Sequence, residues 1–217
     1  MRIAIAGAGN VGRAIARELL ENGHQVLLIV KDPKALKMDS VPTAEWLLAD
    51  ACEVTALDQA KLDGCQVLVA ATGDDKVNLV ASLLGKTEYG VPRVVARVNH
   101  PKNEWMFDNS WGVDVAVSTP RIISALVEEA VSVGDVVRLF SFRKGEANLV
   151  EITLPDTAAC CGKTVGEIEL PEDASIAAIV RDGHVITPKD HDVFAAGDEL
   201  LFVASAKAEE KLKSCFI

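Results

Sequence analysis

The feature that most constrains the fold of this chain is a glycine-rich loop near the N-terminus, between an apolar strand and a helix. Residues 2–6 form a short apolar run, and the loop 7–12 follows with the sequence GAGNVG. A helical pattern then extends to Asn22 and Gly23, and residues 26–30 form a second apolar strand. A strand, a GxGxxG loop, a helix and a second strand in this order are typical of a unit that binds nucleotide phosphates.

Each glycine of the loop has a separate expected role. Gly7 permits a tight turn, Gly9 lets the backbone approach a pyrophosphate, and Gly12 lets the helix pack closely against the strand. The helix that begins near Asn10 would present its free amide groups to the phosphates. The alternative is a purely structural glycine turn. We assign the whole loop to the candidate site: Gly7, Ala8, Gly9, Asn10, Val11 and Gly12.

The alternation of strands and helices continues beyond this first unit and predicts the fold class. Further strands are expected at residues 46–48, 67–71, 94–98 and 113–117, and helical segments at 53–62, 76–86, 103–109 and from Pro120 to about Val133. Six strands, each paired with helical material, predict an α/β protein with a Rossmann-like, doubly wound parallel sheet.

The pattern changes after Gly134 and Asp135. Strand-like segments follow closely on one another, with turn signals at residues 144–146 and at Asp182-Gly183, and a final helix is expected at 207–215. These features predict a small α+β C-terminal domain with mostly antiparallel strands. We therefore expect two domains, at residues 1–133 and 134–217. The expected strands of the second domain are 136–142, 149–154, 175–181, 184–187 and 199–204.

Composition narrows the function classes. The chain has 217 residues and a net charge of −10, which argues against nucleic acid as a partner, because phosphate neutralisation needs clustered Lys and Arg. No apolar run reaches the ~18 residues of a membrane span, and no signal peptide precedes the first strand. The five cysteines include no CxxC pair, so we expect reduced thiols in a cytoplasmic protein and no metal site.

The residues after the second strand depart from the common dinucleotide pattern. An acidic residue that binds the ribose hydroxyls is expected at this strand end, about 20 residues after the loop. Val30 stands there and cannot accept a hydrogen bond, while Lys31 and Asp32 follow. Asp32 is a candidate ribose ligand or an acid of a solvated loop. Lys31 is a candidate partner of a phosphorylated ribose, and Val30 and Asp32 are kept as site positions.

Two other strand ends supply candidates on the same carboxyl edge of the sheet. Asp50 and Ala51 follow the third strand, and Asp50 is interpreted either as a partner of the adenine amino group or as the N-cap of the next helix. Arg97 ends the fifth strand and is interpreted as a phosphate ligand, with a surface arginine in an interface as the alternative.

The end of the fourth strand lies next to the expected topological switch point of the sheet. Thr72, Gly73 and Asp74 are assigned to the site there, partly through their backbone atoms. Thr72 and Asp75 also match the pattern of a helix capping box.

Several segments together carry a resemblance to a known family: GAGNVGRAIARELLENGH (7–24), LADA (48–51), ATGDDKVNLVASLLGK (71–86), GVPRVVARVNHP (90–101) and GVDVAVSTPRIISALV (112–127). With these segments the chain resembles the RCK (KTN/TrkA-type) regulatory subunits of bacterial potassium uptake systems. The stretch from about residue 135, with GKTVGE (162–167) and GDEL (197–200), resembles the smaller C-terminal domain of that family.

The resemblance implies a cytoplasmic regulatory subunit without catalytic activity, peripheral at the inner face of the cell membrane. Such subunits bind NAD(H) or ATP/ADP in the N-terminal domain, self-associate through that domain into dimers and a ring, and gate a membrane potassium transporter subunit of the Trk or Ktr type. By position, the family's nucleotide site falls on the glycine loop, Asp50, Thr72, Gly73, Asp74 and Arg97. The family's strand-end acid falls on Val30, which leaves NAD(H) and ATP/ADP both open.

Two other functions remain alternatives. One is an NAD(P)-dependent oxidoreductase, for which His100, Lys102, His184 and His191 are the candidate proton donors. The other is a nucleotide sensor with a different partner. Three aromatic residues at near-helical spacing are interpreted as core or dimer packing, with a docking patch as the alternative: Trp105, Phe107 and Trp111.

Overall fold

The computed structural model describes residues 1–131, 133–142 and 147–217, and its internal contacts divide the chain into two units, Met1–Pro120 and Arg121–Ile217. The predicted domain boundary after residue 133 stays a prediction, since the division by contacts falls thirteen residues earlier, within a helix. The turn expected at residues 144–146 lies outside the described residues.

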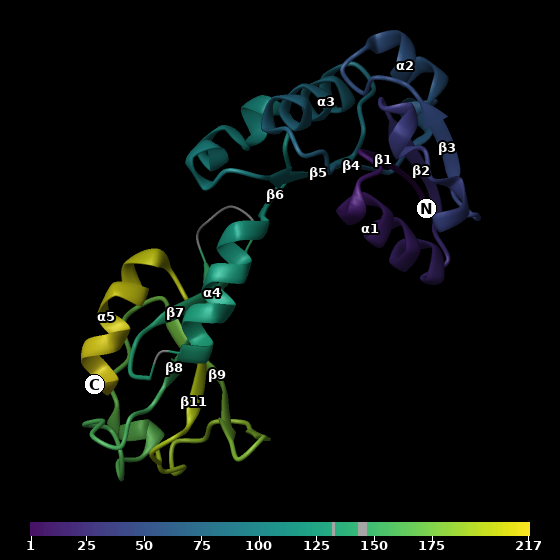
Figure 1. Cartoon of the computed structure of the whole chain (residues 1–217). Coiled ribbons are helices and arrows are strands. Elements are labelled where there is room, and N and C mark those ends of the chain that lie inside the picture. Colours follow the sequence, from purple (N-terminus) through teal and green to yellow (C-terminus); the bar gives the residue numbers. More distant parts are fainter. Residues whose placement is uncertain (132, 143–146) are drawn as a thin grey trace. The chain divides into compact units, whose positions relative to one another are not determined.

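The first unit contains a parallel six-stranded sheet, as the alternating pattern predicts (Figure 1). The strand order is β3-β2-β1-β4-β5-β6, so the chain reverses its direction of winding between β1 and β4. The strands are β1 (Arg2–Ala6), β2 (Gln25–Val30), β3 (Glu45–Leu48), β4 (Val67–Ala70), β5 (Arg93–Val98) and β6 (Val115–Ser118). The helices that follow them are α1 (Asn10–Glu21), α2 (Val54–Gln59), α3 (Asp75–Thr87) and α4 (Thr119–Val131).

Helices cover both faces of this sheet, α1 on one and α2 with α3 on the other (Figure 1). Successive residues of β1 divide between the two layers, because side chains alternate along a strand. Ile3 and Ile5 pack in the cluster that contains Ala16 of α1, whereas Ala4 and Ala6 pack in the cluster that contains Leu79 of α3. The doubly wound prediction is therefore confirmed.

The turn from β1 into α1 is unusually close. Gly7 has a φ of +107°, a conformation that a residue with a side chain rarely adopts. A Cβ atom at Gly12 would lie 1.9 Å from the carbonyl oxygen of Gly7. The helix can therefore begin directly over the strand end only with glycine at both positions.

The second unit is a small α+β domain, again as predicted. Its antiparallel five-stranded sheet has the order β10-β9-β11-β8-β7, and a helix, α5 (Ala206–Phe216), packs against it through Leu212 and Phe216. Asp182 and Gly183 form the predicted hairpin turn, both with positive φ. The strands are β7 (Val137–Ser141), β8 (Asn148–Thr153), β9 (Ala174–Arg181), β10 (His184–Ile186) and β11 (Glu199–Ala204).

Two expected elements of the first unit differ in detail. The helix expected at 103–109 is replaced by 3-10 turns at Pro101–Met106 and Asn109–Trp111, where Phe107 is buried in the core and Trp105 is 77% exposed. The strand expected at 113–117 lies at Val115–Ser118, because Val113 closes the preceding turn by donating its N–H to Asp108. Within the described residues, the search for a helix long and apolar enough to cross a membrane finds none.

We predict that Gly12→Ala lowers the free energy of unfolding of the first unit by about 1–3 kcal/mol, since the added methyl group forces α1 away from β1. Tryptophan fluorescence during urea denaturation measures this change, because Trp46, Trp105 and Trp111 all lie in the first unit. Gly73→Ala is the matched control, as a Cβ there meets no atom within 4 Å. An unchanged midpoint for Gly12→Ala would contradict the prediction.

Candidate nucleotide site

The glycine loop presents the N-terminus of α1 without a side-chain cap. Gly9 is the N-cap residue and has extended backbone angles, and within the described residues no side chain caps the helix by accepting a hydrogen bond from its first backbone N–H groups. A Cβ atom at Gly9 would meet no atom within 4 Å, so open space lies beside the backbone there. Free amide groups and the positive end of the helix dipole face this space, which suits a phosphate group.

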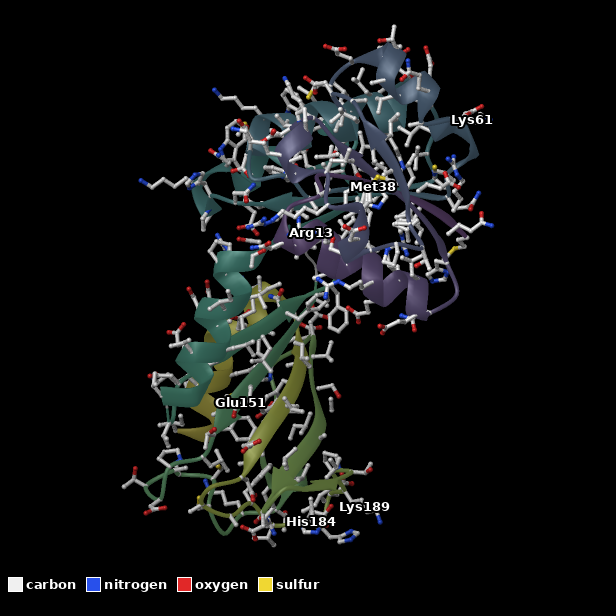
Figure 2. The ribbon with its side chains drawn as sticks, turned by 45° about the vertical axis from the view of Figure 1, so that its right-hand side comes forward. Arg13, Met38, Lys61, Glu151, His184 and Lys189 are labelled. Atoms are coloured by element: carbon white, nitrogen blue, oxygen red, sulfur yellow. The ribbon has the colours of Figure 1, made fainter. Side chains whose placement is uncertain are left out.

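Arg13 stabilises the shape of the loop from the first turn of α1 (Figure 2). Its guanidinium group donates to the carbonyl oxygen of Ala8 and, at 2.8 Å, to Oδ1 of Asn10. Ala8 is buried, whereas Asn10 is exposed and Val11 partly exposed. The loop residues assigned to the site therefore lie together around the N-terminus of α1, with their backbone held by a long side chain.

The end of β2 lies beside this loop. The register pairs Ala6 with Ile29, and the N–H of Gly7 donates to the carbonyl oxygen of Ile29 at 2.9 Å. Val30 comes next and its side chain is buried in the apolar layer under α1. Asp32 is exposed and caps a 3-10 turn by accepting a hydrogen bond from the N–H of Lys34 at 2.9 Å.

Lys31 and Asp50 form an ion pair across the ends of β2 and β3, with Nζ and Oδ2 2.6 Å apart. The other oxygen of Asp50 accepts the N–H of Cys52, and Ala51 between them is buried. These hydrogen bonds, above all the one from Lys31, lower the pKa of Asp50, and the same bond raises the pKa of Lys31. The N-cap of α2 is Glu53, so Asp50 does not cap that helix.

A buried asparagine of α3 organises the end of β4. Asn78 has no exposed surface, and its Oδ1 accepts hydrogen bonds from the N–H and the hydroxyl group of Thr72, at 2.9 and 2.7 Å. Its Nδ2 donates to the carbonyl oxygens of Thr72 and Arg97. One side chain thus satisfies four polar groups and holds the ends of β4 and β5 in fixed positions.

Asp75 extends this network to the loop after β5. Its carboxylate accepts the backbone N–H groups of Asn99 and His100 and the side-chain amides of Asn99 and Asn103, at 2.7–3.0 Å. Burial raises the pKa of Asp75, but these hydrogen bonds outweigh the burial and lower the pKa below its ordinary value. Asp75 therefore acts as a charged hub between two loops.

The predicted capping box of Thr72 and Asp75 is wrong. Asp74 is the N-cap of α3 and accepts from the N–H groups of Lys76 and Val77, while Gly73 lies in the turn before it. The hydroxyl group of Thr72 donates to Asn78 instead, and Asp75 points to the β5 loop. Both polar groups are recruited by tertiary hydrogen bonds, which the local pattern does not encode.

Arg97 lies on β5, on the face opposite to the buried neighbours Ala96 and Val98, and is partly exposed. Its Nε is buried and has no hydrogen-bond partner within the described part of the chain. A buried N–H without an acceptor is costly, and an anion at this position would satisfy it. The arginine therefore fits the predicted role of a phosphate ligand, which stays a prediction.

The candidate proton donors of the oxidoreductase alternative are all exposed and are divided between the two units. His100 is exposed at the start of a 3-10 turn, and its backbone rather than its ring contacts Asp75. His184 and His191 lie in the second unit, where both are exposed. Lys102 is exposed as well.

Sequence reasoning missed the residues that position the site rather than face it. Arg13, Asn78 and Asn99 were not singled out, yet each holds a loop that contains assigned site residues. A signal existed for Asn78, because a polar residue within the apolar pattern of 77–84 is expected to need buried partners. Arg13 and Asn99 gave no comparable signal.

The comparisons with known proteins agree with this arrangement. Residues 3–119 match the family model of the TrkA-N domain, and residues 149–216 match that of the TrkA-C domain. The chain is 57% identical over 212 residues to the Trk system potassium uptake protein TrkA of Mycobacterium tuberculosis, with 98% of this chain and 96% of that protein covered.

Longer relatives contain about twice this length. A TrkA homolog of Archaeoglobus fulgidus is 29% identical over 219 residues, which cover all of this chain and 50% of the homolog. Among solved structures, a GsuK channel bound to NAD has a TM-score of 0.66 and 18% identity, covering 98% of this chain and 39% of the channel chain. That likeness supports the fold.

We predict that Asp75→Asn destabilises the first unit at pH 7 by about 1–3 kcal/mol, because an amide nitrogen cannot accept the hydrogen bonds that one carboxylate oxygen now receives. The pKa of Asp75 is lowered in the folded state, so its contribution is complete above the unfolded pKa and is lost as the pH falls through the folded pKa.

The difference between wild type and Asp75→Asn should therefore be constant above about pH 5 and shrink towards pH 3. Urea denaturation followed by tryptophan fluorescence at several pH values measures it. Asp39→Asn, at an exposed acid of the same unit, is the control. A difference that grows on acidification would refute the role of Asp75.

Proposed function

We propose that this chain, which belongs to the TrkA family, is a nucleotide-binding regulatory subunit of a potassium uptake system. The relative at 57% identity bears the name of a Trk system potassium uptake protein over nearly its full length. The observation that carries the proposal is the uncapped N-terminus of α1 over open space at Gly9.

The ligand we propose is a nucleotide with at least two phosphates, NAD(H) or ATP/ADP. Two features at separate strand ends support it: the amide groups of the glycine loop and the buried Nε of Arg97. Groups of both kinds bind phosphate oxygens, and neither distinguishes one nucleotide base from another. We propose that the adenine ring lies beside Asp50 and Ala51 at the end of β3, and that Thr72, Gly73 and Asp74 at the end of β4 line the other half of the site.

The proposed mechanism needs no catalysis. A ligand shifts a conformational equilibrium by the difference in its affinity for two states, typically ~1–3 kcal/mol of coupling. The loops after β4 and β5 are already tied together by Asn78 and Asp75. A nucleotide that contacts both this pair of loops and the glycine loop favours one arrangement of the first unit. We therefore propose that the chain is a sensor, not an enzyme.

We further propose that copies of the chain self-associate through the N-terminal domain, into dimers and a ring. Trp105 of the first unit exposes 77% of its surface, and single large aromatic residues of this kind are common anchors at protein interfaces. Helix α4 lies within the predicted N-terminal domain 1–133, although its residues from Arg121 on fall in the second unit. It carries an apolar stripe in which Ile123, Leu126 and Val127 are each more than half exposed. Large exposed apolar surfaces mark interaction sites.

The proposed partner is a membrane potassium transporter subunit of the Trk or Ktr type, and the proposed location is the cytoplasm, at the inner face of the cell membrane. The names of the relatives support the partner. The net charge of −10 supports a protein partner over nucleic acid.

We predict that one or more of NADH, NAD⁺, ATP and ADP raises the stability of the protein, by about 2.7 kcal/mol at one hundred times Kd. Gly9→Asp should keep the fold, because Asp is a favoured N-cap residue and the space is open, but should abolish binding by repelling phosphate. Thermal denaturation with each ligand measures both effects.

Gly9→Asn is the matched control, because it has the same shape without the charge and separates repulsion from steric exclusion. If the ligand stabilises Gly9→Asp as much as wild type, the nucleotide binds at a site other than the glycine loop. No stabilisation of wild type by any of the four ligands would refute nucleotide binding.

We also predict that cells lacking this protein take up potassium slowly at low external potassium. Wild type should restore uptake and Gly9→Asp should not, at equal protein levels, because only the nucleotide-bound subunit regulates the transporter. Uptake of rubidium as a tracer measures the rate. Full restoration by Gly9→Asp would contradict the prediction, because uptake would then not depend on nucleotide binding at the glycine loop.

A further inference from the structure

The residues at the end of β2 also bear on which class of nucleotide the site binds. We infer that the adenosine half of this site binds a ribose that carries a 2′-phosphate, as in NADP(H), with the ammonium group of Lys31 as its partner. The inference rests on the proposed function, because it concerns the same site. It goes beyond NAD(H) and ATP/ADP by adding a 2′-phosphate to the adenosine half that these nucleotides share.

The position of Lys31 follows from the strand register. Gly7 lies beside Val30 at the carboxyl edge, because Ala6 pairs with Ile29 and the N–H of Gly7 donates to the carbonyl oxygen of Ile29. Lys31 follows Val30 in the chain and lies just beyond the residue pair Gly7 and Val30. A nucleotide whose phosphates lie on the N-terminus of α1 places its adenosine ribose over the same strand end.

The two acids near this strand end, Asp32 and Asp50, both already accept hydrogen bonds from other groups of the described chain, and the strand-end position itself is Val30. Val30 is 5% exposed and packs in the apolar cluster with Ile5 and Leu28. Asp32 is turned to its own loop, where its Oδ1 accepts the N–H of Lys34. The end of β2 therefore lacks the carboxylate that selects an unphosphorylated ribose.

Lys31 supplies the opposite chemistry. Its side chain is 76% exposed, and within the described part of the chain its ammonium group donates one hydrogen bond, to Oδ2 of Asp50 at 2.6 Å. An ammonium group has three donors and no acceptor, so two N–H bonds remain for phosphate oxygens. A basic residue in place of the acid is the arrangement that accommodates a 2′-phosphate.

Asp50 holds the ammonium group of Lys31 at the strand end, and its carboxylate keeps a hydrogen bond from the backbone if Lys31 turns to a ligand. Its other oxygen accepts the N–H of Cys52, so the carboxylate has a second donor from the backbone. The ion pair holds the ammonium group at the strand end, which lowers the conformational entropy that a ligand would otherwise have to remove. An exposed ion pair by itself contributes little to folding.

The position of one phosphate on the ribose tests the inference. Adenosine 2′,5′-bisphosphate and adenosine 3′,5′-bisphosphate have the same charge, and 5′-AMP lacks the second phosphate. Calorimetric titration of the full chain should show the 2′,5′ isomer binding at least about tenfold more tightly than the 3′,5′ isomer at low ionic strength. The preference should shrink at high salt, because Lys31 is exposed.

Lys31→Gln should make the two isomers bind equally and leave the affinity for 5′-AMP nearly unchanged. Lys34→Gln is the matched control, since this exposed lysine of the same loop has no side-chain hydrogen bond or ion pair within the described residues, and it should keep the preference. NADPH should likewise bind more tightly than NADH to wild type and not to Lys31→Gln.

Equal binding of the two isomers to wild type, or a preference that survives in Lys31→Gln, overturns the inference and leaves Lys31 as a surface ion-pair partner. If 5′-AMP, ADP and NADH bind in those cases, the proposed function stands alone. If no adenine nucleotide binds, both fail together.

Discussion

The candidate site depends on the contact between the carbonyl oxygen of Gly7 and the backbone of Gly12. A Cβ atom at Gly12 would lie 1.9 Å from this oxygen, so only glycine lets α1 begin directly above the end of β1. That closeness brings the first amide groups of α1 to the carboxyl edge of the sheet. Gly9 between them contributes no packing and leaves the space open. Two glycines thus build the turn, and the third keeps the phosphate position accessible.

The opposite half of the site is built by side chains that never need to touch a ligand. Asn78 and Asp75 of α3 are both buried. Asn78 donates a hydrogen bond to the carbonyl oxygen of Arg97 on β5, and Asp75 accepts one from the N–H of Asn99 just after β5. Their polar groups are satisfied by the protein itself, which makes the two loops stiff. Lys31 and Arg97 differ from these residues, since each has donor capacity beyond its contacts within the described residues. These two side chains are therefore the ones proposed to bind the ligand.

Local patterns predicted most of the fold because the central strands β1 and β2 are apolar and almost fully buried, and strong turn signals separate the elements. The glycine loop, the alternation of strands and helices and the Asp182-Gly183 hairpin all depend on nearby residues. The roles of Thr72, Asp75 and Asp50 depend on partners 6 to 28 residues away, and Lys31 and Asp50 meet only because β2 and β3 pair. The positions of Thr72 and Asp50 at strand ends identified them as site candidates, but the sequence could not assign their partners.

The position of α4 in the chain indicates where nucleotide binding can act. The loops after β4 and β5 are tied to each other by Asn78 and Asp75, so a nucleotide that contacts them acts on the pair as one body. Helix α4 begins at Thr119, directly after β6, and so leaves the sheet from the same carboxyl edge as the glycine loop and Arg97. Its apolar stripe at Ile123, Leu126 and Val127 is exposed in the single chain. We propose that nucleotide binding acts through self-association of the chain, because a coupling of ~1–3 kcal/mol is enough to change which assembly is favoured. This proposal needs a difference in nucleotide affinity between two assemblies and no reacting group at the site.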